Sequence, residues 1–233
     1  MKKTIVIFLF FVFALFAKEG LTQNKPFLFG FHVAPNIGWM NPDAVGYEND
    51  GTKMGFSWGF ISQFYLMDNY FINTGFDVTY LNTRLTYPHT IINMQDSSLI
   101  DGVLYRNYKL KYIKVPLELK MMTKEFGNMR FYGKIGLGTS FLINADAKDE
   151  FQSSGENDVN SEKDIEDEVK FIRESLIIGI GVDFNLGGST TLSVGMTFDN
   201  GFVDILNDQN TTDPSINNDA INNFVELNIG IIF

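Results

Sequence analysis

Large apolar side chains alternate with small or polar ones throughout the chain after its first two dozen residues. One stretch, for example, sets Leu192, Val194, Met196 and Phe198 against Ser193, Gly195, Thr197 and Asp199. Because successive side chains of a β-strand point to opposite faces, this period of two predicts strands with one apolar and one polar face. The segments that show the pattern are Phe27–Met40, Met54–Met67, Tyr70–Leu81, Ile113–Met121, Met129–Ala145, Ser175–Leu186, Thr191–Asp199 and Phe224–Phe233.

The apolar faces of these segments are almost uniformly large. Phe accounts for 23 of the 233 residues, yet no apolar run after the N-terminal segment reaches the roughly 18 residues that a membrane-spanning helix needs. The opposite faces combine charged side chains with Gly, Ser and Asn. This arrangement is typical of a barrel with lipid outside and a polar interior. A soluble lipocalin-like carrier, in which the apolar face points inward, is the alternative fold.

Short and long connections alternate between the predicted strands. The short ones are Asp68-Asn69, Thr123–Asn128 and Gly187–Ser189, and the long ones cover about residues 41–53, 82–104, 148–168 and 205–223. Short turns at one rim and long loops at the other are the pattern of outer-membrane barrels. In lipid, only closure pairs every backbone group of a sheet. The sequence therefore predicts an all-β fold: an eight-stranded antiparallel up-and-down transmembrane β-barrel with short periplasmic turns and long extracellular loops.

Ionisable side chains also fall on the polar faces of these strands and would point into the barrel. They are Asp77, Lys114, Glu118, Lys120, Arg130, Lys134, Asp183, Asp199 and Glu226. Side chains just fill the interior of an eight-stranded barrel, and buried charges need partners of opposite sign. We therefore expect a salt-bridged charge network that fills the lumen. A narrow porin-like channel or a site for a small ligand is the alternative.

The first residues have the composition of an export signal. Lys2 and Lys3 precede a 14-residue apolar stretch, Thr4–Ala17, which is too short to span a bilayer and has the size of a signal-peptide core. We expect residues 1–22 to be a signal peptide that is cleaved near residue 17 or 22. Residues 23–233 would then form the barrel domain in the cell outer membrane. A retained N-terminal anchor is the alternative.

The apolar phase changes by one residue near the middle of the chain. Tyr108, Leu110 and Tyr112 occupy even positions. From Ile113 onward the apolar residues occupy odd positions. A one-residue change of phase predicts a β-bulge, and Pro116, just beyond it, suits such an irregular point because it donates no N–H group.

The stretch Tyr112–Lys120 (YIKVPLELK) resembles a motif of the small outer-membrane barrels of Bacteroidota, known as the outer membrane protein beta-barrel domain or PorT-like family. The following glycines, Gly133, Gly136 and Gly138, and the terminal Phe233 are similar too. The resemblance implies the barrel fold and an outer-membrane location, and it transfers no functional residues. The terminal Phe also resembles the signal that the barrel-assembly machinery recognises during biogenesis.

Composition and motifs argue against several classes of function. A net charge of −10 is unsuited to nucleic acid, and the absence of Cys excludes thiolate metal sites and Cys catalysis. Ser57 lies in a G-x-S-x-G pattern, but inside a predicted strand rather than at the strand-to-helix turn that a nucleophile elbow needs. The acidic segment 148–168 has carboxylates that suit Ca²⁺ but lacks the EF-hand order, which favours a solvated loop.

These observations favour a non-enzymatic protein without a cofactor or a metal. We expect it to act as a structural scaffold or through interactions of its extracellular loops. The expected partners are outer-membrane lipid, the barrel-assembly machinery, and envelope proteins that bind the loops.

Overall fold

A computed structural model describes residues 27–92, 97–153, 157–207, 210 and 212–233 of the chain. The predicted signal peptide and its cleavage positions lie outside these residues. The described elements are β1 (Phe27–Pro42), β2 (Glu48–Met67), β3 (Tyr70–Ile92), β4 (Leu99–Met122), β5 (Met129–Gln152), β6 (Asn157–Asp164), the 3₁₀ helix η1 (Glu166–Glu168), β7 (Ile172–Gly187), β8 (Thr190–Gly201) and β9 (Ala220–Ile232). Within the described residues, no helix is long and apolar enough to cross a membrane.

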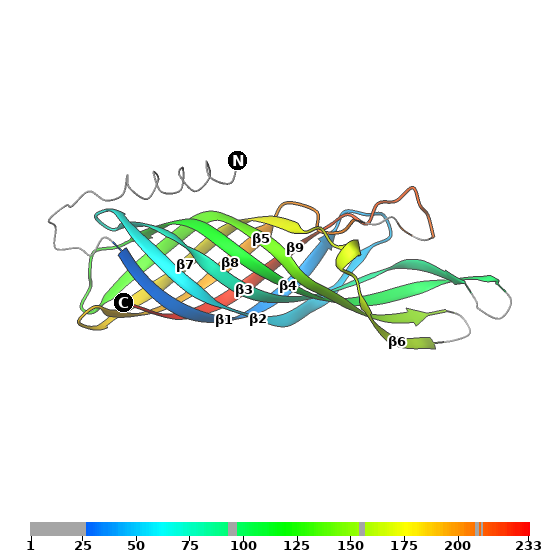
Figure 1. The fold of residues 1–233 in the computed structure, drawn as a ribbon, viewed down its shortest axis with the longest axis horizontal. Coiled ribbons are helices and arrows are strands. Elements are labelled where there is room, and N and C mark those ends of the chain that lie inside the picture. Colours follow the sequence, from blue (N-terminus) through cyan, green and yellow to red (C-terminus); the bar gives the residue numbers. More distant parts are fainter. Residues whose placement is uncertain (1–26, 93–96, 154–156, 208–209, 211) are drawn as a thin grey trace, which may run out of the picture.

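Eight of the strands close into a ring (Figure 1). Neighbours pair antiparallel in the order β1–β2–β3–β4–β5–β7–β8–β9, and β9 pairs with β1 to complete the circle. The additional strand, β6, pairs with the outer part of β5, beyond the residues of β5 that pair with β7. The predicted eight-stranded antiparallel up-and-down barrel is therefore confirmed.

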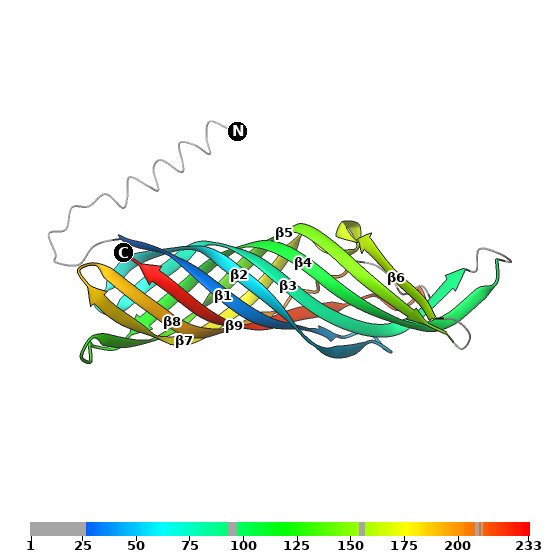
Figure 2. The same ribbon diagram turned by 90° about the horizontal axis from the view of Figure 1, so that it is seen from below.

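The two ends of the barrel differ in the length of their connections, as the sequence predicts. The β2–β3, β4–β5 and β7–β8 connections are short, and β1 starts and β9 ends beside them (Figure 2). Asn69 (φ 67°) and Gly188 (φ 63°) adopt the left-handed backbone that such tight turns use. In outer-membrane barrels the end with the short turns faces the periplasm, and the other end faces outward.

Three of the predicted long loops are in large part β-structure. β3 and β4 stay paired from Tyr70 opposite Met121 out to Ile92 opposite Leu99, which includes most of the predicted loop 82–104. The predicted loop 148–168 contains the end of β5, all of β6 and η1, and β2 starts inside the predicted loop 41–53. With 23 or 24 residues, β3, β4 and β5 are about twice as long as the nine to eleven residues that cross a bilayer.

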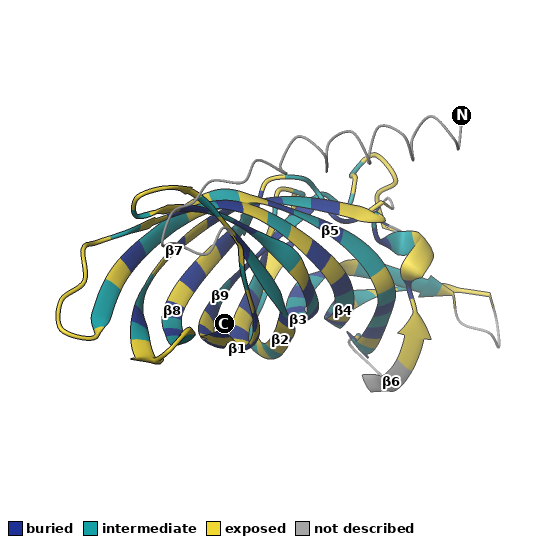
Figure 3. Ribbon diagram, turned by 60° about the vertical axis from the view of Figure 1, so that its left-hand side comes forward, coloured by how far each residue is buried: buried dark blue, intermediate teal, exposed yellow. Residues whose placement is uncertain are grey.

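The polarity of the two faces inverts along these long strands. Toward the periplasmic end of β4, Ile113 and Leu117 point outward with 40% and 60% of their surface exposed, and Lys114 points inward and is buried. Toward the outer end, Lys109 points outward and Leu110 is buried inside. Figure 3 shows the resulting alternation of buried and exposed residues along the strands.

This inversion corrects the predicted position of the bulge. Even-numbered residues of β4 face the interior on both sides of Tyr112, so the phase of β4 does not change. The register shift lies opposite, where Lys111 pairs with Asn144 and Tyr112 with Leu142, which leaves Ile143 of β5 as the extra residue. The shift of apolar residues from even to odd positions in β4 therefore reflects a change of the inward side chains from apolar to charged, and not a change of phase.

Apolar side chains that face outward around a closed ring need lipid to cover them. The outward apolar band ends at about Tyr80 of β3, whose ring lies 5.2 Å from Nζ of its outward neighbour Lys111. Aromatic rings and cations of this kind are typical of the membrane interface. The lipocalin-like alternative, which needs the same side chains packed inside, is therefore not supported.

We call the part of the barrel beyond Tyr80 and Lys111 the extracellular extension; of the described residues it comprises 41–53, 82–92, 97–111, 144–153, 157–171, 202–207, 210 and 212–220. Its interior is an apolar core. The buried side chains of this core include Tyr47, Leu85, Tyr87, Leu104, Tyr108, Leu110, Phe151, Ile165, Val169, Ile205 and Leu206. On β4 and β5 polar side chains such as Lys109 and Lys148 face outward here, so these strands have the inside–outside pattern of a water-soluble β-domain.

Candidate functional site

Charged side chains fill the lumen within the membrane-spanning part of the barrel. Lys114 of β4 lies at its centre, with Nζ 3.6 Å from Asp77, 3.4 Å from Asp199 and 3.9 Å from Glu226. Each of these four side chains is at most 7% exposed. The ammonium group therefore sits among three carboxylates from β3, β8 and β9, and links the opposite walls of the barrel.

Two further groups complete this central cluster. On one side, Nη2 of Arg173 donates to Oδ1 of Asp199 at 2.7 Å, and its guanidinium also bonds the side chain of Asn222. On the other side, Nε2 of His32 lies 2.7 Å from Oδ1 of Asp77. Each carboxylate of the cluster lies within 4 Å of a cationic side chain, which offsets part of the cost of burying it.

A second cluster lies nearer the periplasmic end. Nζ of Lys134 donates to Glu118 at 3.0 Å, and Nζ of Lys120 donates to Oδ2 of Asp183 at 2.6 Å. The ring of Tyr132 lies 4.2 Å from the ammonium of Lys120 and fixes it from another direction. A cavity of about 50 Å³ is lined by side chains of both clusters.

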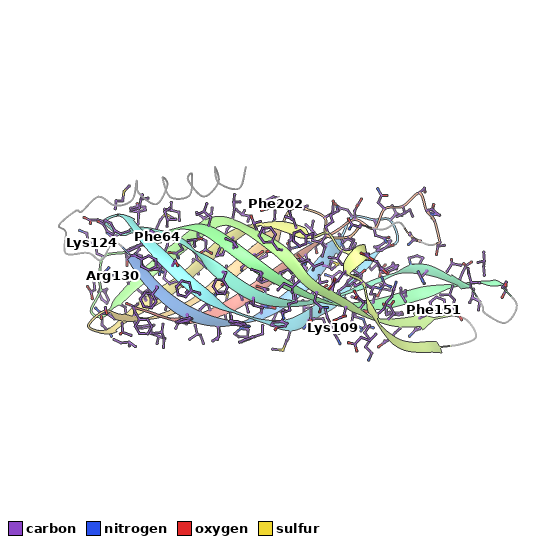
Figure 4. All side chains as sticks on the ribbon, viewed as in Figure 1. Phe64, Lys109, Lys124, Arg130, Phe151 and Phe202 are labelled. Carbon is purple, nitrogen blue, oxygen red and sulfur yellow. The ribbon has the colours of Figure 1, made fainter. Side chains whose placement is uncertain are left out.

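The structure brings together most of the predicted interior charges. The residues that it places in the two clusters are Asp77, Lys114, Glu118, Lys120, Lys134, Asp183, Asp199 and Glu226. Arg130 is the exception, because its side chain is 42% exposed and its Nη2 lies 3.3 Å from Glu125 in the β4–β5 turn. Figure 4 shows Arg130 beside Lys124 at the end of the barrel with the short turns. Arg130 stands at the second residue of β5, too close to the rim to be covered.

Sequence reasoning missed Arg173, which is among the most deeply buried side chains of the chain. The prediction started the strand at Ser175. Arg173 is in phase with the inward residues Ser175 and Ile177, so extending the alternation by two residues would have found it.

The outer end of the lumen is closed by two segments that fold into the extracellular extension. Residues 165–171 and 202–207 meet there, and Val169 and Leu206 form an isolated β-bridge. The backbone N–H of Lys170 donates to the carbonyl of Ile205 at 2.7 Å, and that of Asn207 to the carbonyl of Glu168 at 3.0 Å. The side chains of Ile165, Val169, Ile205 and Leu206 are buried between the walls.

Arg106 fastens the first of these segments to the barrel wall. Its guanidinium donates to both carboxylate oxygens of Asp149 at 2.7 and 2.6 Å, and to Glu168 at 2.5 Å. Burial alone would raise the pKa of Glu168, but the hydrogen bond from Lys163 and the charge of Arg106 hold that pKa below its usual value. Burial raises the pKa of Tyr108 to about 12 although the charge of Arg106 lowers it, so this phenol stays neutral.

The remaining candidates from the sequence are placed as follows. Ser57 lies in the middle of β2, where its Oγ accepts a hydrogen bond from Asn36 at 3.1 Å. Within the part of the chain that the structure describes, no group of three or more His, Asp or Glu side chains could hold a metal ion. The terminal Phe233 exchanges backbone hydrogen bonds with Phe29 at 3.3 and 2.8 Å, which closes the barrel at its periplasmic end.

Several solved structures are similar to this chain in fold. Neisserial surface protein A is 12% identical, with a TM-score of 0.45 over 89% of this chain and 96% of that one. OprG from Pseudomonas aeruginosa is 9% identical, with a TM-score of 0.44 over 89% and 95%. Ail of Yersinia pestis is 15% identical, with a TM-score of 0.38 over 90% and 100%. No curated protein matches the sequence.

A family model gives the clearest relationship. The model described as "Outer membrane protein beta-barrel domain" matches residues 18–207, which is most of the chain. The Bacteroidota and PorT-like part of the resemblance stays a prediction. With its closed ring, outward apolar band and charge-filled lumen, the chain belongs to the outer membrane protein beta-barrel domain family.

Proposed function

We propose that the protein is a non-enzymatic, non-conducting outer-membrane scaffold that anchors the extracellular extension and presents it to envelope partners. The observation that supports this most is the closure of the lumen. Above the charged clusters, the apolar core of the extension and the two inward-folded segments occupy the space through which a solute would pass. A continuous channel for ions needs water along its whole length, and at its outer end this interior is packed largely with apolar side chains.

The structure of the extension also supports a presenting role. Its strands continue those of the barrel, so it is joined to the membrane anchor by two or more paired strands rather than by flexible loops. Sites on rigid elements hold their geometry better than sites on loops. Its segment 144–171 is strongly acidic, which favours a partner with a basic surface.

Recordings of single-channel conductance in planar bilayers test the non-conducting reading. The folded protein, checked by heat-modifiable migration on a gel, should give no discrete current steps when an open porin in the same bilayer gives clear ones. Regular steps from the wild-type protein would overturn the proposal in favour of a narrow channel.

Export and assembly are proposed on the sequence features alone. Residues 1–22 act as the signal peptide, and Phe233 acts in recognition by the barrel-assembly machinery. Mass spectrometry of the protein from outer membranes should show a chain that begins near residue 18 or 23. Deletion of Phe233 should lower the amount of folded barrel, and an unchanged yield would contradict the role of this residue.

A further inference from the structure

β6 forms an open edge of the sheet in the extracellular extension. Within the membrane, β5 pairs with β7 as far as Phe141 opposite Ile172, and beyond that point β6 takes the place of β7. Among the strands that the structure describes, β6 pairs with β5 alone (Figure 1). An open edge presents backbone N–H and C=O groups with which another extended chain can pair.

The register of β6 identifies the backbone groups that face the open side. The N–H of Ile165, directly after the last residue of β6, donates to the carbonyl of Ala145 on β5 at 2.9 Å. In an antiparallel ladder, residues alternate between pairs that exchange both backbone hydrogen bonds and pairs that exchange none. Lys163 therefore bonds to β5, whereas the N–H and C=O groups of Glu162 and Asp164 point away from β5, to the open side.

Solvent reaches this part of β6 at both faces of the sheet. The side chains of Glu162 and Lys163 point to opposite faces, because they are neighbours in a strand, and they are 64% and 55% exposed. No described strand lies on the open side of β6. A further strand can therefore be added there without displacing a strand of the described barrel.

The surface beside the open edge is acidic. Among the described side chains that face outward from β6 and the adjoining part of β5, Asp146, Glu150, Glu162 and Asp164 accompany one cation, Lys148. A second copy of the chain would bring the same carboxylates to the edge, and like charges opposite each other in a sheet are destabilising. A segment with Lys or Arg side chains has the complementary charge.

We propose that β6 binds a basic, extended peptide segment of an envelope partner, which joins the sheet as a further strand. Backbone hydrogen bonds to Glu162 and Asp164 hold the segment. Directly opposite side chains lie on the same face of a sheet, so Lys or Arg at every second position of the segment meets these two carboxylates. This inference rests on the proposed presenting role of the extension and assigns that role to one strand.

The contact of Glu162 with Lys109 does not block this site. Nζ of Lys109 lies 2.6 Å from Oε1 of Glu162, but both side chains are more than half exposed. Exposed ion pairs of this kind contribute little to stability, so a second cation can share or replace the contact at small cost. The backbone groups of Glu162 take no part in it.

Hydrogen exchange of the detergent-folded full chain tests the site with a heptapeptide of alternating Lys and Val, blocked at both ends. The peptide should slow exchange saturably in residues 157–164 and leave residues 82–92 of β3 unchanged. An analogue with N-methylated lysine amides keeps the charges but cannot donate to the carbonyls of β6, and it should bind about tenfold more weakly or worse. The same heptapeptide with Glu in place of Lys should not bind.

Two results of this experiment would overturn the proposal. Equal binding of the N-methylated analogue would show attraction by charge alone, without an added strand. Slower exchange of residues 157–164 at higher protein concentration, with no peptide present, would show that a second copy occupies the edge.

Two variants of Glu162 separate the backbone contact from the charge. Glu162→Pro removes the N–H group that faces the open side and keeps the bonds of β6 to β5, since an edge strand tolerates Pro where its N–H faces away from the sheet. It should weaken peptide binding by about tenfold or more, and Glu162→Gln, which keeps the N–H, by about two- to threefold. If Glu162→Pro does not keep β6 paired, the N-methylated analogue decides on the wild-type chain.

Failure of this inference is distinguishable from failure of the proposed function. No saturable protection up to about 1 mM peptide, or equal protection in Glu162→Pro with β6 still paired, would overturn β6 as the docking strand and leave the non-conducting scaffold. Current steps in planar bilayers would overturn the scaffold whatever the peptide does.

Discussion

Lys114 is the side chain on which the largest group of buried charges depends. It lies within 4 Å of carboxylates from three other strands, and the ring of Phe224 lies 5.1 Å from its Nζ. Removing one partner from a buried ionic cluster leaves the other charges uncompensated. This lowers the stability more than replacing the whole cluster with apolar residues would.

We therefore predict that Lys114→Met destabilises the folded barrel by about 3–5 kcal/mol. The matched control is Lys111→Met, because Lys111 lies on the same strand and faces outward at the membrane interface. That change should alter stability by no more than about 0.5 kcal/mol. Urea unfolding in detergent micelles measures both values. Similar losses for the two variants would show that the lumen cluster does not hold the strands together.

Glu168 gives the closure of the lumen a dependence on pH. Because the pKa of Glu168 is lowered in the folded state, its contribution to stability is present above the unfolded value of about 4.5 and is lost as the pH falls through the folded pKa. Hydrogen exchange in residues 165–171, corrected for its intrinsic pH dependence, should therefore accelerate below about pH 4.5.

The variant Glu168→Gln is the control for this prediction. It should show faster exchange in the same segment already at neutral pH and little further change on acidification. If wild-type protection of residues 165–171 were the same at pH 7 and well below pH 4.5, the contact of Arg106 with Glu168 would not fasten the segment.

At the scale of single strands, β2 and β3 approach each other so closely at Gly75 that a side chain does not fit. A Cβ atom there would lie 1.9 Å from the carbonyl oxygen of Phe60, and the φ of Gly75 is +150°. Both facts require glycine, since backbone atoms of a paired strand cannot move aside as a flexible side chain can.

Gly75→Ala should therefore destabilise the barrel by about 1–3 kcal/mol. Gly133→Ala is the matched control, because Gly133 lies in a neighbouring part of the sheet with its nearest atom 4.0 Å from the added Cβ. That variant should be close to neutral. Thermal loss of the folded form, followed on heat-modifiable gels, ranks the two, and a more stable Gly75→Ala than Gly133→Ala would contradict the close approach.

The strands also show how far the sequence predicts this fold. In the membrane, lipid forces one strict pattern, so alternation alone predicted the eight strands and most of the inward charges, with Arg130 wrongly included and Arg173 missed. In the extracellular extension, the pattern is reversed and weaker, with Ala145 and Ala147 inside and Tyr105 and Asn107 outside. Small inward residues and mixed outward residues look like a loop when each segment is read without its partners, and this is why the extension was missed.

The contacts in the lumen were predictable only as a set. The alternation of residues along each strand predicts that Lys114 and Asp199 both face inward. It does not predict which charges come into contact, because that depends on the stagger of the strands across the barrel. The exposure of Arg130 was not predictable either. It depends on the position of Arg130 near the rim of the barrel, and the alternation pattern does not contain that information.

For the molecule as a whole, the strands divide into a lipid-facing barrel and a water-facing extension that share one continuous sheet. The boundary is the level of Tyr80 and Lys111, where outward side chains change from apolar to polar and inward ones from charged to apolar. The proposed roles of the closed lumen and of the presented extension depend on this boundary.

Spin labels on single cysteines test the boundary directly, because the natural chain contains no Cys. Labels at Leu117 and Ile113 in lipid nanodiscs should be relaxed by dissolved oxygen and not by a water-soluble nickel chelate, whereas labels at Lys109 and Asn107 should show the reverse. If the label at Leu117 were as accessible to the chelate as the label at Lys109, the apolar band would not face lipid and the account would be contradicted.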